Sequence, residues 1–165
     1  MAETKRKHAA ELAEHVSDAK RAIAEEKAEF EELEVLDLSV DQARMLQCLG
    51  AGWAYPLQRF MNEQELHEML NLKLINADGV QYPMSVPITL AVTEHDKNKL
   101  ENEKKIALKC KKLSDQVLAV IDMPIFYNYN KDDLVAKLFG TQSIKHPRVA
   151  EIMKQGAYFL TSKRP

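Results

Sequence analysis

Apolar residues near the start of the chain recur at intervals of three and four, the spacing of one face of an α-helix. They are Ala9, Leu12, Val16, Ala19, Ile23 and, after an interruption at Glu26, Phe30. No glycine or proline occurs from Glu3 to Glu32, and alanine, glutamate and lysine dominate, so one long helix over residues 1–32 is predicted. Because the apolar stripe is narrow and rich in alanine, two roles stay open. The helix lies along its own domain, or it binds a partner or self-associates.

Beyond residue 32, the polar positions that precede each apolar stretch are typical of helix starts. The predicted caps are Ser39, with Gln42 completing a capping box, then Asn62, Thr93 and Asn130, and Pro147 takes the first position of the last helix. Glycines close three of these segments, at Gly50 or Gly52, at Gly140 and at Gly156. Five helices or helical turns are therefore expected in residues 33–165.

Between these helices, other stretches are typical of strands. They are 33–38, the segment VQYPMSVPITLAV after an Ala-Asp-Gly turn, KKIALKCKK, VLAVIDMPIFY and AYFL. KKIALKCKK and VLAVIDMPIFY are expected to form a hairpin. Helices and strands follow one another without regular alternation, so we expect an α+β domain with a mostly antiparallel sheet or small β-barrel.

Residues 50–61, GAGWAYPLQRFM, place rigid apolar side chains between two predicted helices. Either this segment is a folded cap over the core, or it is a surface for a partner.

Length and composition limit the classes of protein to consider. A chain of 165 residues has room for one domain, which we place at 33–165, and a helical extension at 1–32. No apolar run approaches the roughly 20 residues of a membrane span, so no membrane partner is expected. A net charge of −2 makes nucleic acid an unlikely partner. The start of the chain lacks a secretory pattern, and we expect the protein to be cytoplasmic.

The sequence offers few residues for chemistry. Its five glycines form no phosphate-binding loop, and its five histidines are not spaced as metal ligands. The carboxylate pairs Asp132–Asp133 and Glu25–Glu26 suit helix positions better than acid–base catalysis. We therefore expect no catalytic, cofactor-binding or metal-binding residue in this chain, and no cofactor.

One basic feature stands out, the series Lys105, Lys109 and Lys111 on a predicted strand. Exposed lysines commonly protect the edge of a sheet from pairing with another chain. The same residues could contact RNA or another polyanion through its phosphates. Both interpretations are kept here, with edge protection preferred.

Four blocks of sequence carry a resemblance to a known family. The blocks are GWAYPLQRFMNEQELHEML, MSVPITLAV, VLAVIDMPIFY and FGTQSIKHPRVAEIMKQGAYFL. In order and spacing this stretch, roughly residues 35–160, resembles the N-terminal domain of ATP sulfurylase (sulfate adenylyltransferase), most closely that of bifunctional phosphoadenylyl-sulfate synthetases. The resemblance implies a PUA-like fold, a small, mostly antiparallel β-barrel with packed helices.

The resemblance also gives residues 50–61 a role, a compact turn that covers the core with its aromatic residue, Trp53, buried. Pro56, Leu57, Phe60 and Met61 keep the family pattern, whereas Arg59 stands where the family usually has glycine. If that glycine is needed for a positive φ, arginine costs about 1 kcal/mol there or the turn differs.

The resemblance implies that adenylyl transfer is performed by a following domain, which carries Gln-x-Arg-Asn and His-x-x-His motifs. Neither motif occurs in these 165 residues. The expected function is therefore that of a non-catalytic domain supporting sulfate activation. Its expected partner is an ATP-sulfurylase catalytic domain, in cis or in trans, and the chain is expected to be inactive alone. The alternatives are a free-standing PUA-like module that binds a polyanion, or an interaction protein whose first helix self-associates.

Overall fold

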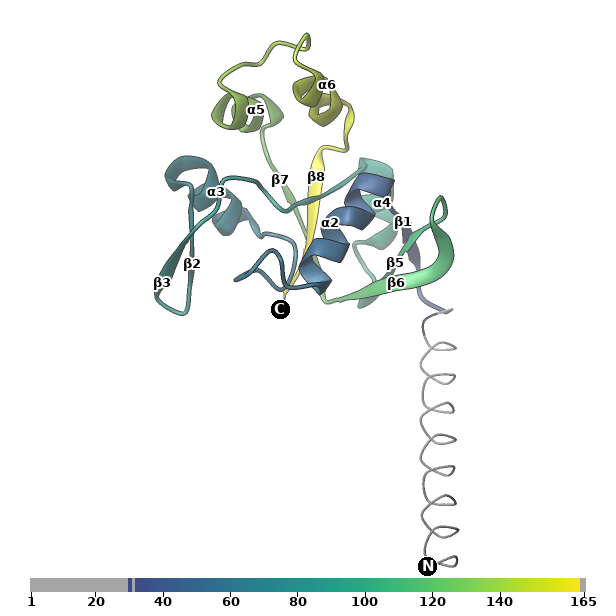
Figure 1. Cartoon of the computed structure of the whole chain (residues 1–165). Coiled ribbons are helices and arrows are strands. Elements are labelled where there is room, and N and C mark those ends of the chain that lie inside the picture. The colour runs from purple at the N-terminus through teal and green to yellow at the C-terminus, as the bar shows by residue number, and fades with distance from the viewer. Residues whose placement is uncertain (1–29, 31, 164–165) are drawn as a thin grey trace, which may run out of the picture. The chain divides into compact units, whose positions relative to one another are not determined.

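The structure, a computed structural model, describes residue 30 and residues 32–163 (Figure 1). Most of the helix predicted over residues 1–32 lies outside the described residues. That helix, and the boundary after residue 32, stay predictions. From residue 34 onward the chain forms one unit.

Within the described residues the chain forms five helices and eight strands. The helices are α2 (Val40–Gly50), α3 (Glu63–Leu72), α4 (Glu94–Leu100), α5 (Lys131–Phe139) and α6 (Pro147–Lys154). The strands are β1 (Val35–Asp37), β2 (Leu74–Ala77), β3 (Val80–Pro83), β4 (Leu90–Val92), β5 (Lys105–Cys110), β6 (Ser114–Asp122), β7 (Pro124–Asn128) and β8 (Tyr158–Ser162). All five helices expected after residue 32 are present, so this part of the prediction is confirmed.

The strands form three separate small sheets, with strand orders β1-β5-β6, β2-β3 and β4-β8-β7. Every neighbouring pair is antiparallel except β1 and β5, which run parallel. The α+β class with mostly antiparallel pairing is therefore confirmed. The predicted barrel is wrong for the described residues. A barrel needs an unbroken ring of hydrogen-bonded strands, whereas here no described strand of one sheet is hydrogen-bonded in a ladder to a strand of another.

The run VLAVIDMPIFY, expected as one strand, belongs to two sheets. It is divided at Met123, whose φ of +50° lies in the left-handed region and turns the chain from β6 into β7. The Met123 amide donates to the carbonyl of Lys104 (2.8 Å), and the amide of Lys163 donates to the Met123 carbonyl (3.1 Å). Both backbone groups at the turn are thus paired. The hairpin predicted between β5 and β6 is present.

The helix starts follow the local sequence. Ser39 and Gln42 form the predicted capping box on α2, and Asn62 does the same with Glu65 on α3. The Asn130 side chain accepts hydrogen bonds from the first-turn amides of α5, which ends at Gly140 in the left-handed conformation. Short-range hydrogen bonds of this kind explain why these boundaries are readable from sequence.

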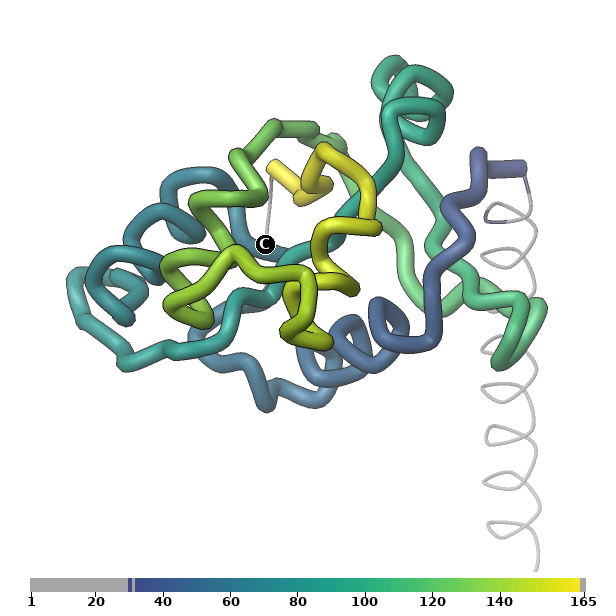
Figure 2. The backbone as a smooth tube through the Cα atoms, turned by 90° about the horizontal axis from the view of Figure 1, so that it is seen from above, coloured from purple at the N-terminus to yellow at the C-terminus, as the bar shows by residue number. Residues whose placement is uncertain are grey.

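A close backbone contact joins α6 and β8 to β4. Gly156 lies between α6 and β8, and a Cβ atom added there would lie 1.8 Å from the Val92 carbonyl oxygen. The position therefore requires glycine. Seen from above, β8 lies near the middle of the domain, between the β2–β3 hairpin and the β5–β6 hairpin (Figure 2).

Candidate functional site

The segment 50–61 covers the core only in part. Ala54, Leu57, Phe60 and Met61 are buried, which confirms the cap. Trp53, however, is 83% exposed, so its predicted burial is wrong. Its amide continues the turn at the end of α2 by donating to the carbonyl of Cys48 (3.0 Å), and the residue before it, Gly52, has a φ of +73°. This tight turn leaves the indole facing solvent.

Tyr55, in the same segment, is also exposed, at 66%. Its ring meets that of Tyr82 on β3 edge to face, with ring centroids 5.3 Å apart, and the two hydroxyl oxygens are 3.3 Å apart. This hydrogen bond is the first cause of a raised pKa at Tyr82. The contact fixes the Tyr55 ring while leaving its surface open.

Arg59 needs no unusual backbone, because its φ is not positive. The glycine that the family usually has is therefore not required here for conformational reasons. Instead the guanidinium forms a two-pronged ion pair with the Glu65 carboxylate, at 2.8 and 3.0 Å, and donates to the Phe60 carbonyl at 3.1 Å. Glu65 also accepts the Asn62 amide, at 2.8 Å, so Arg59 ties the segment to the start of α3.

Two buried hydroxyls hold the end of the same segment. The Thr161 hydroxyl on β8 donates to the Phe60 carbonyl (2.5 Å), and the Tyr127 hydroxyl on β7 donates to the Met61 carbonyl (2.7 Å). Burial, more than the nearby carboxylates, raises the pKa of the Tyr127 hydroxyl well above its usual range. The segment is therefore fixed by side chains from β7, β8 and α3.

A hollow of about 430 Å³ opens beside this segment and is called the loop hollow here. It lies between the C-terminal half of α2, the segment itself, strands β5 and β6, and the end of β8. Its lining is mostly apolar: Leu46, Leu49, Gly50, Gln58, Arg59, Phe60, Leu108, Leu118, Ala119, Val120, Ile121, Asp122 and Ser162.

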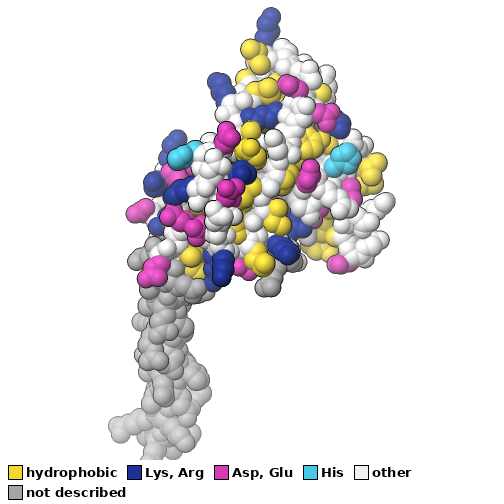
Figure 3. All heavy atoms as spheres, turned by 180° about the vertical axis from the view of Figure 1, so that it is seen from behind, with side chains coloured by type: hydrophobic (Ala, Val, Ile, Leu, Met, Phe, Trp, Pro, Cys, Tyr) yellow, Lys and Arg dark blue, Asp and Glu magenta, His cyan; other side chains and the backbone are white. Residues whose placement is uncertain are grey.

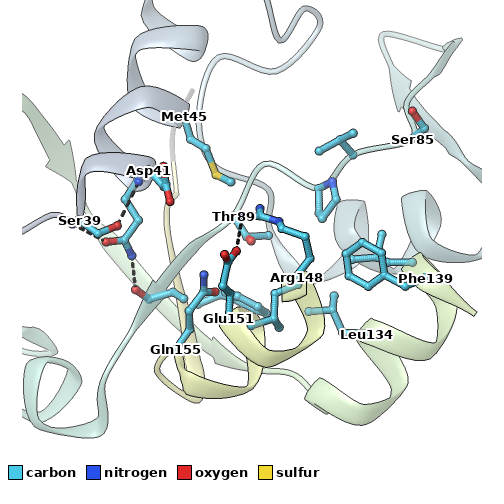
Figure 4. Close-up of a pocket in the computed structure, with 17 residues that line it drawn as sticks. Ser39, Asp41, Met45, Ser85, Thr89, Leu134, Phe139, Arg148, Glu151 and Gln155 are labelled. Carbon is cyan, nitrogen blue, oxygen red and sulfur yellow. Dashed lines mark hydrogen bonds and ion pairs between the residues drawn. The ribbon is translucent and has the colours of Figure 1, made fainter. Parts of the chain in front are cut away.

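A second hollow, of about 360 Å³, is called the helix hollow here (Figure 4). It lies between the start of α2, residues 85–91, and the helix pair α5 and α6. Apolar side chains such as Leu134 and Phe159 line it together with hydroxyl and amide groups. Among its lining residues Arg148 forms an ion pair with Glu151 (2.5 Å), and Gln42 donates to the carbonyl of Ala91 (2.6 Å).

The residues that line the two hollows include few groups suited to proton transfer. Neither lining contains a histidine or a cysteine, and a nucleophilic hydroxyl needs a base held beside it. The carboxylates of Asp41 and Glu151 are each paired with an arginine. Within residues 30 and 32–163, no group of three side chains is arranged to hold a metal ion, and no helix combines the length and apolar character needed to cross a membrane.

The three lysines of the predicted basic strand lie on and just after β5. This strand is in the middle of its sheet, between β1 and β6, so the interpretation that they protect a sheet edge is wrong. Lys105 and Lys109 are half-buried, Lys111 is exposed, and a register shift on either side of Lys109 interrupts the alternation. On the face that Figure 3 shows, basic side chains are interspersed with acidic ones. Binding of a polyanion at these lysines stays a prediction.

Sequence reasoning found the caps but missed the ion pair of Arg59 with Glu65. The Asn62-x-x-Glu65 capping box gave one signal, because it fixes the Glu65 carboxylate near the segment that carries Arg59. The hollows gave no local signal, since each combines segments far apart in the chain.

Several curated proteins are similar to this chain. ATP sulfurylase 2 of Arabidopsis thaliana is 27% identical over 84% of the chain, and the sulfate adenylyltransferase of Entamoeba histolytica is 30% identical over 82%. The sulfate adenylyltransferase of Desulforamulus reducens is 31% identical over 83%. The match takes in 29%, 32% and 34% of these proteins respectively, so the chain spans about a third of the length of the relatives it matches.

A solved structure supports the fold. The hexameric APS kinase from Thiobacillus denitrificans has a TM-score of 0.56 and 18% sequence identity, over 82% of this chain and 22% of that one. At this identity the similarity concerns the fold alone. The sequence pattern of the PUA-like domain family matches residues 5–163, which is nearly the whole chain. The chain thus belongs to the PUA-like domain family and is similar to a part of sulfate adenylyltransferases, as its sequence blocks had indicated.

Proposed function

We propose that this chain is the non-catalytic PUA-like domain of a sulfate adenylyltransferase. In this function it supports sulfate activation, the reaction of ATP with sulfate to give adenylyl sulfate and pyrophosphate, while another domain performs the chemistry. The observation that carries the proposal is the match of more than four-fifths of the chain to about one third of each of several sulfate adenylyltransferases.

Three features of the chain support this proposal. The Gln-x-Arg-Asn and His-x-x-His motifs of the family's catalytic domain do not occur in its sequence. In the helix hollow, the carboxylates of Asp41 and Glu151 are paired with arginines rather than poised for proton transfer. The segment 50–61 is held rigidly by Arg59, Tyr127 and Thr161, as suits a domain that presents a fixed surface.

The proposed partner is a sulfate adenylyltransferase catalytic domain, in cis or in trans, and the proposed location is the cytoplasm. The test is a pyrophosphate-release assay with ATP, sulfate and Mg²⁺, in which the Desulforamulus reducens enzyme serves as the positive control. We expect the isolated chain to release no more pyrophosphate than the blank. Sulfate-dependent turnover above the blank, retained through repeated purification, would contradict the proposal.

A further inference from the structure

The most exposed aromatic side chains of the described domain lie together on one short segment. Trp53 is 83% exposed and Tyr55 is 66% exposed, although both follow directly on a helix that packs on the core. A tryptophan side chain can bury about 150–250 Å², and tryptophan and tyrosine are enriched where proteins meet. Two such side chains on one rigid turn indicate a surface that is covered in the working protein.

The loop hollow lies beside the segment that carries these aromatic residues, because residues from both ends of that segment line it. Gln58, Arg59 and Phe60 of the same segment line it, and Leu118, itself 43% exposed, lines it from β6. The charged groups there are engaged: Arg59 pairs with Glu65, and Asp122 has an interaction partner of its own. An apolar socket without free charge suits the apolar side chains of a folded domain better than it suits a polyanion.

The position of β8 indicates which domain covers this surface. Ser162, the last residue of β8, lines the loop hollow, and in Figure 1 the segment 50–61 and the C-terminal end of β8 lie at the same end of the domain. The helices α5 and α6 lie at the opposite end. A catalytic domain joined to the chain after β8, as the proposed function expects, would enter at this end of the domain.

From these observations we propose that the surface formed by Trp53, Tyr55, Leu118 and the loop hollow is the docking face for a sulfate adenylyltransferase catalytic domain. This inference rests on the proposed function and names the surface through which that function is exerted. The hydrogen bonds from Tyr127 and Thr161 hold the face in one arrangement before docking, which lowers the entropy cost of binding.

Trp53 is the single tryptophan of the chain, so a label on tryptophan reports on this surface alone. The full chain is labelled with 5-fluorotryptophan, so that its ¹⁹F spectrum reports Trp53 alone. The added partner is the unlabelled part of the Desulforamulus reducens sulfate adenylyltransferase that lies outside the matched region, checked for folding by circular dichroism. Sedimentation velocity measures complex formation independently of the label.

We expect a complex in which the ¹⁹F resonance shifts and becomes at least fivefold less sensitive to a paramagnetic solute. The variants Trp53→Ser and Leu118→Ser should weaken binding at least tenfold, measured by sedimentation. The matched control is Ile144→Ser, since Ile144 is 72% exposed between α5 and α6 at the opposite end of the domain. All three positions are exposed in the isolated domain, so the variants should melt within a few degrees of the unchanged chain.

The outcomes separate the two claims. A complex with an unchanged ¹⁹F resonance, or one weakened as much by Ile144→Ser as by Trp53→Ser, would overturn the docking face and leave the proposed function standing. A folded partner that forms no complex at high concentration would overturn the proposed function and this inference with it.

Discussion

Replacing Arg59 with glycine tests whether the residue that departs from the family pattern stabilises this domain. The backbone at Arg59 does not have a positive φ, so glycine relieves no strain there. The substitution removes the two-pronged ion pair with Glu65, whose carboxylate also accepts the Asn62 amide at the start of α3. We therefore expect Arg59→Gly to destabilise the domain, although glycine is the residue the family usually has.

The magnitude follows from the burial of the pair. The two side chains are 19% and 20% exposed, between a fully buried and a surface ion pair. Hydrogen bonds to charged groups contribute about 1.5–3 kcal/mol when buried, and exposed pairs about 0.2–1 kcal/mol, so we assign this pair about 1–2 kcal/mol. The extra freedom of glycine in the unfolded chain adds about 0.4–1 kcal/mol. The expected loss is about 2 kcal/mol for Arg59→Gly and somewhat less for Arg59→Ala.

The assay is urea unfolding followed by circular dichroism at 222 nm. The matched control is Arg44→Ala, which removes an arginine from an ion pair with Asp41 whose side chains are 70% and 67% exposed. That control should lose less than about 0.5 kcal/mol. Arg59→Gly with an unfolding free energy equal to or above that of the unchanged chain would refute the reasoning, as would equal losses for Arg59→Ala and Arg44→Ala.

Four further predictions concern Gly156, Tyr127 and the lysines on and just after β5. Gly156→Ala should lower stability by more than about 3 kcal/mol or prevent folding, because its Cβ would lie 1.8 Å from the Val92 oxygen. Gly140→Ala has open space around it and meets only a positive φ, so it should cost about 1 kcal/mol. Equal melting temperatures for the two variants would disprove this. Tyr127→Phe leaves the Met61 carbonyl without its buried donor and should cost about 1–3 kcal/mol in urea unfolding. Because burial raises the pKa of Tyr127 in the folded state, its contribution is complete below about pH 10, the unfolded pKa, and is lost as pH rises above it. The unchanged chain should therefore lose stability above pH 10 more steeply than Tyr127→Phe, and parallel curves would argue against this. Finally, the chain should not be retained by a single-stranded RNA column at 150 mM salt; retention that is abolished by Lys109→Glu with Lys111→Glu would favour the polyanion alternative.

Local features of this fold were readable from the sequence, whereas features that depend on distant segments were not. The capping boxes at Ser39 and Asn62 involve residues three apart, and the structure confirms both. At Met123 the chain passes from β6 into β7, which belong to different sheets, and this turn is held by backbone hydrogen bonds to Lys104 and Lys163. No local pattern around Met123 reveals these partners. For this reason the sequence predicted the run VLAVIDMPIFY as one strand.

The candidate surfaces show the same division. The composition of residues 50–61 indicated either a core cap or a surface for a partner; the structure confirms the cap, since Phe60 and Met61 are buried, but leaves Trp53 and Tyr55 exposed. Periodicity cannot separate these roles in a turn, because each side chain's direction depends on the turn geometry and not on a repeat. The prediction that the lysines protect a sheet edge was wrong for a related reason. Whether a strand is central or at an edge depends on partner strands elsewhere in the chain.

The central claim is that residues 34–163 are a scaffold that acts with a catalytic domain and has no nucleotide site of its own. The most direct measurement is an NMR titration of the ¹⁵N-labelled chain with ATP, Mg²⁺ and sulfate. We expect small, scattered shifts that do not saturate at millimolar nucleotide. Saturable shifts clustered around Arg148 in the helix hollow, or around Arg59 in the loop hollow, would contradict it.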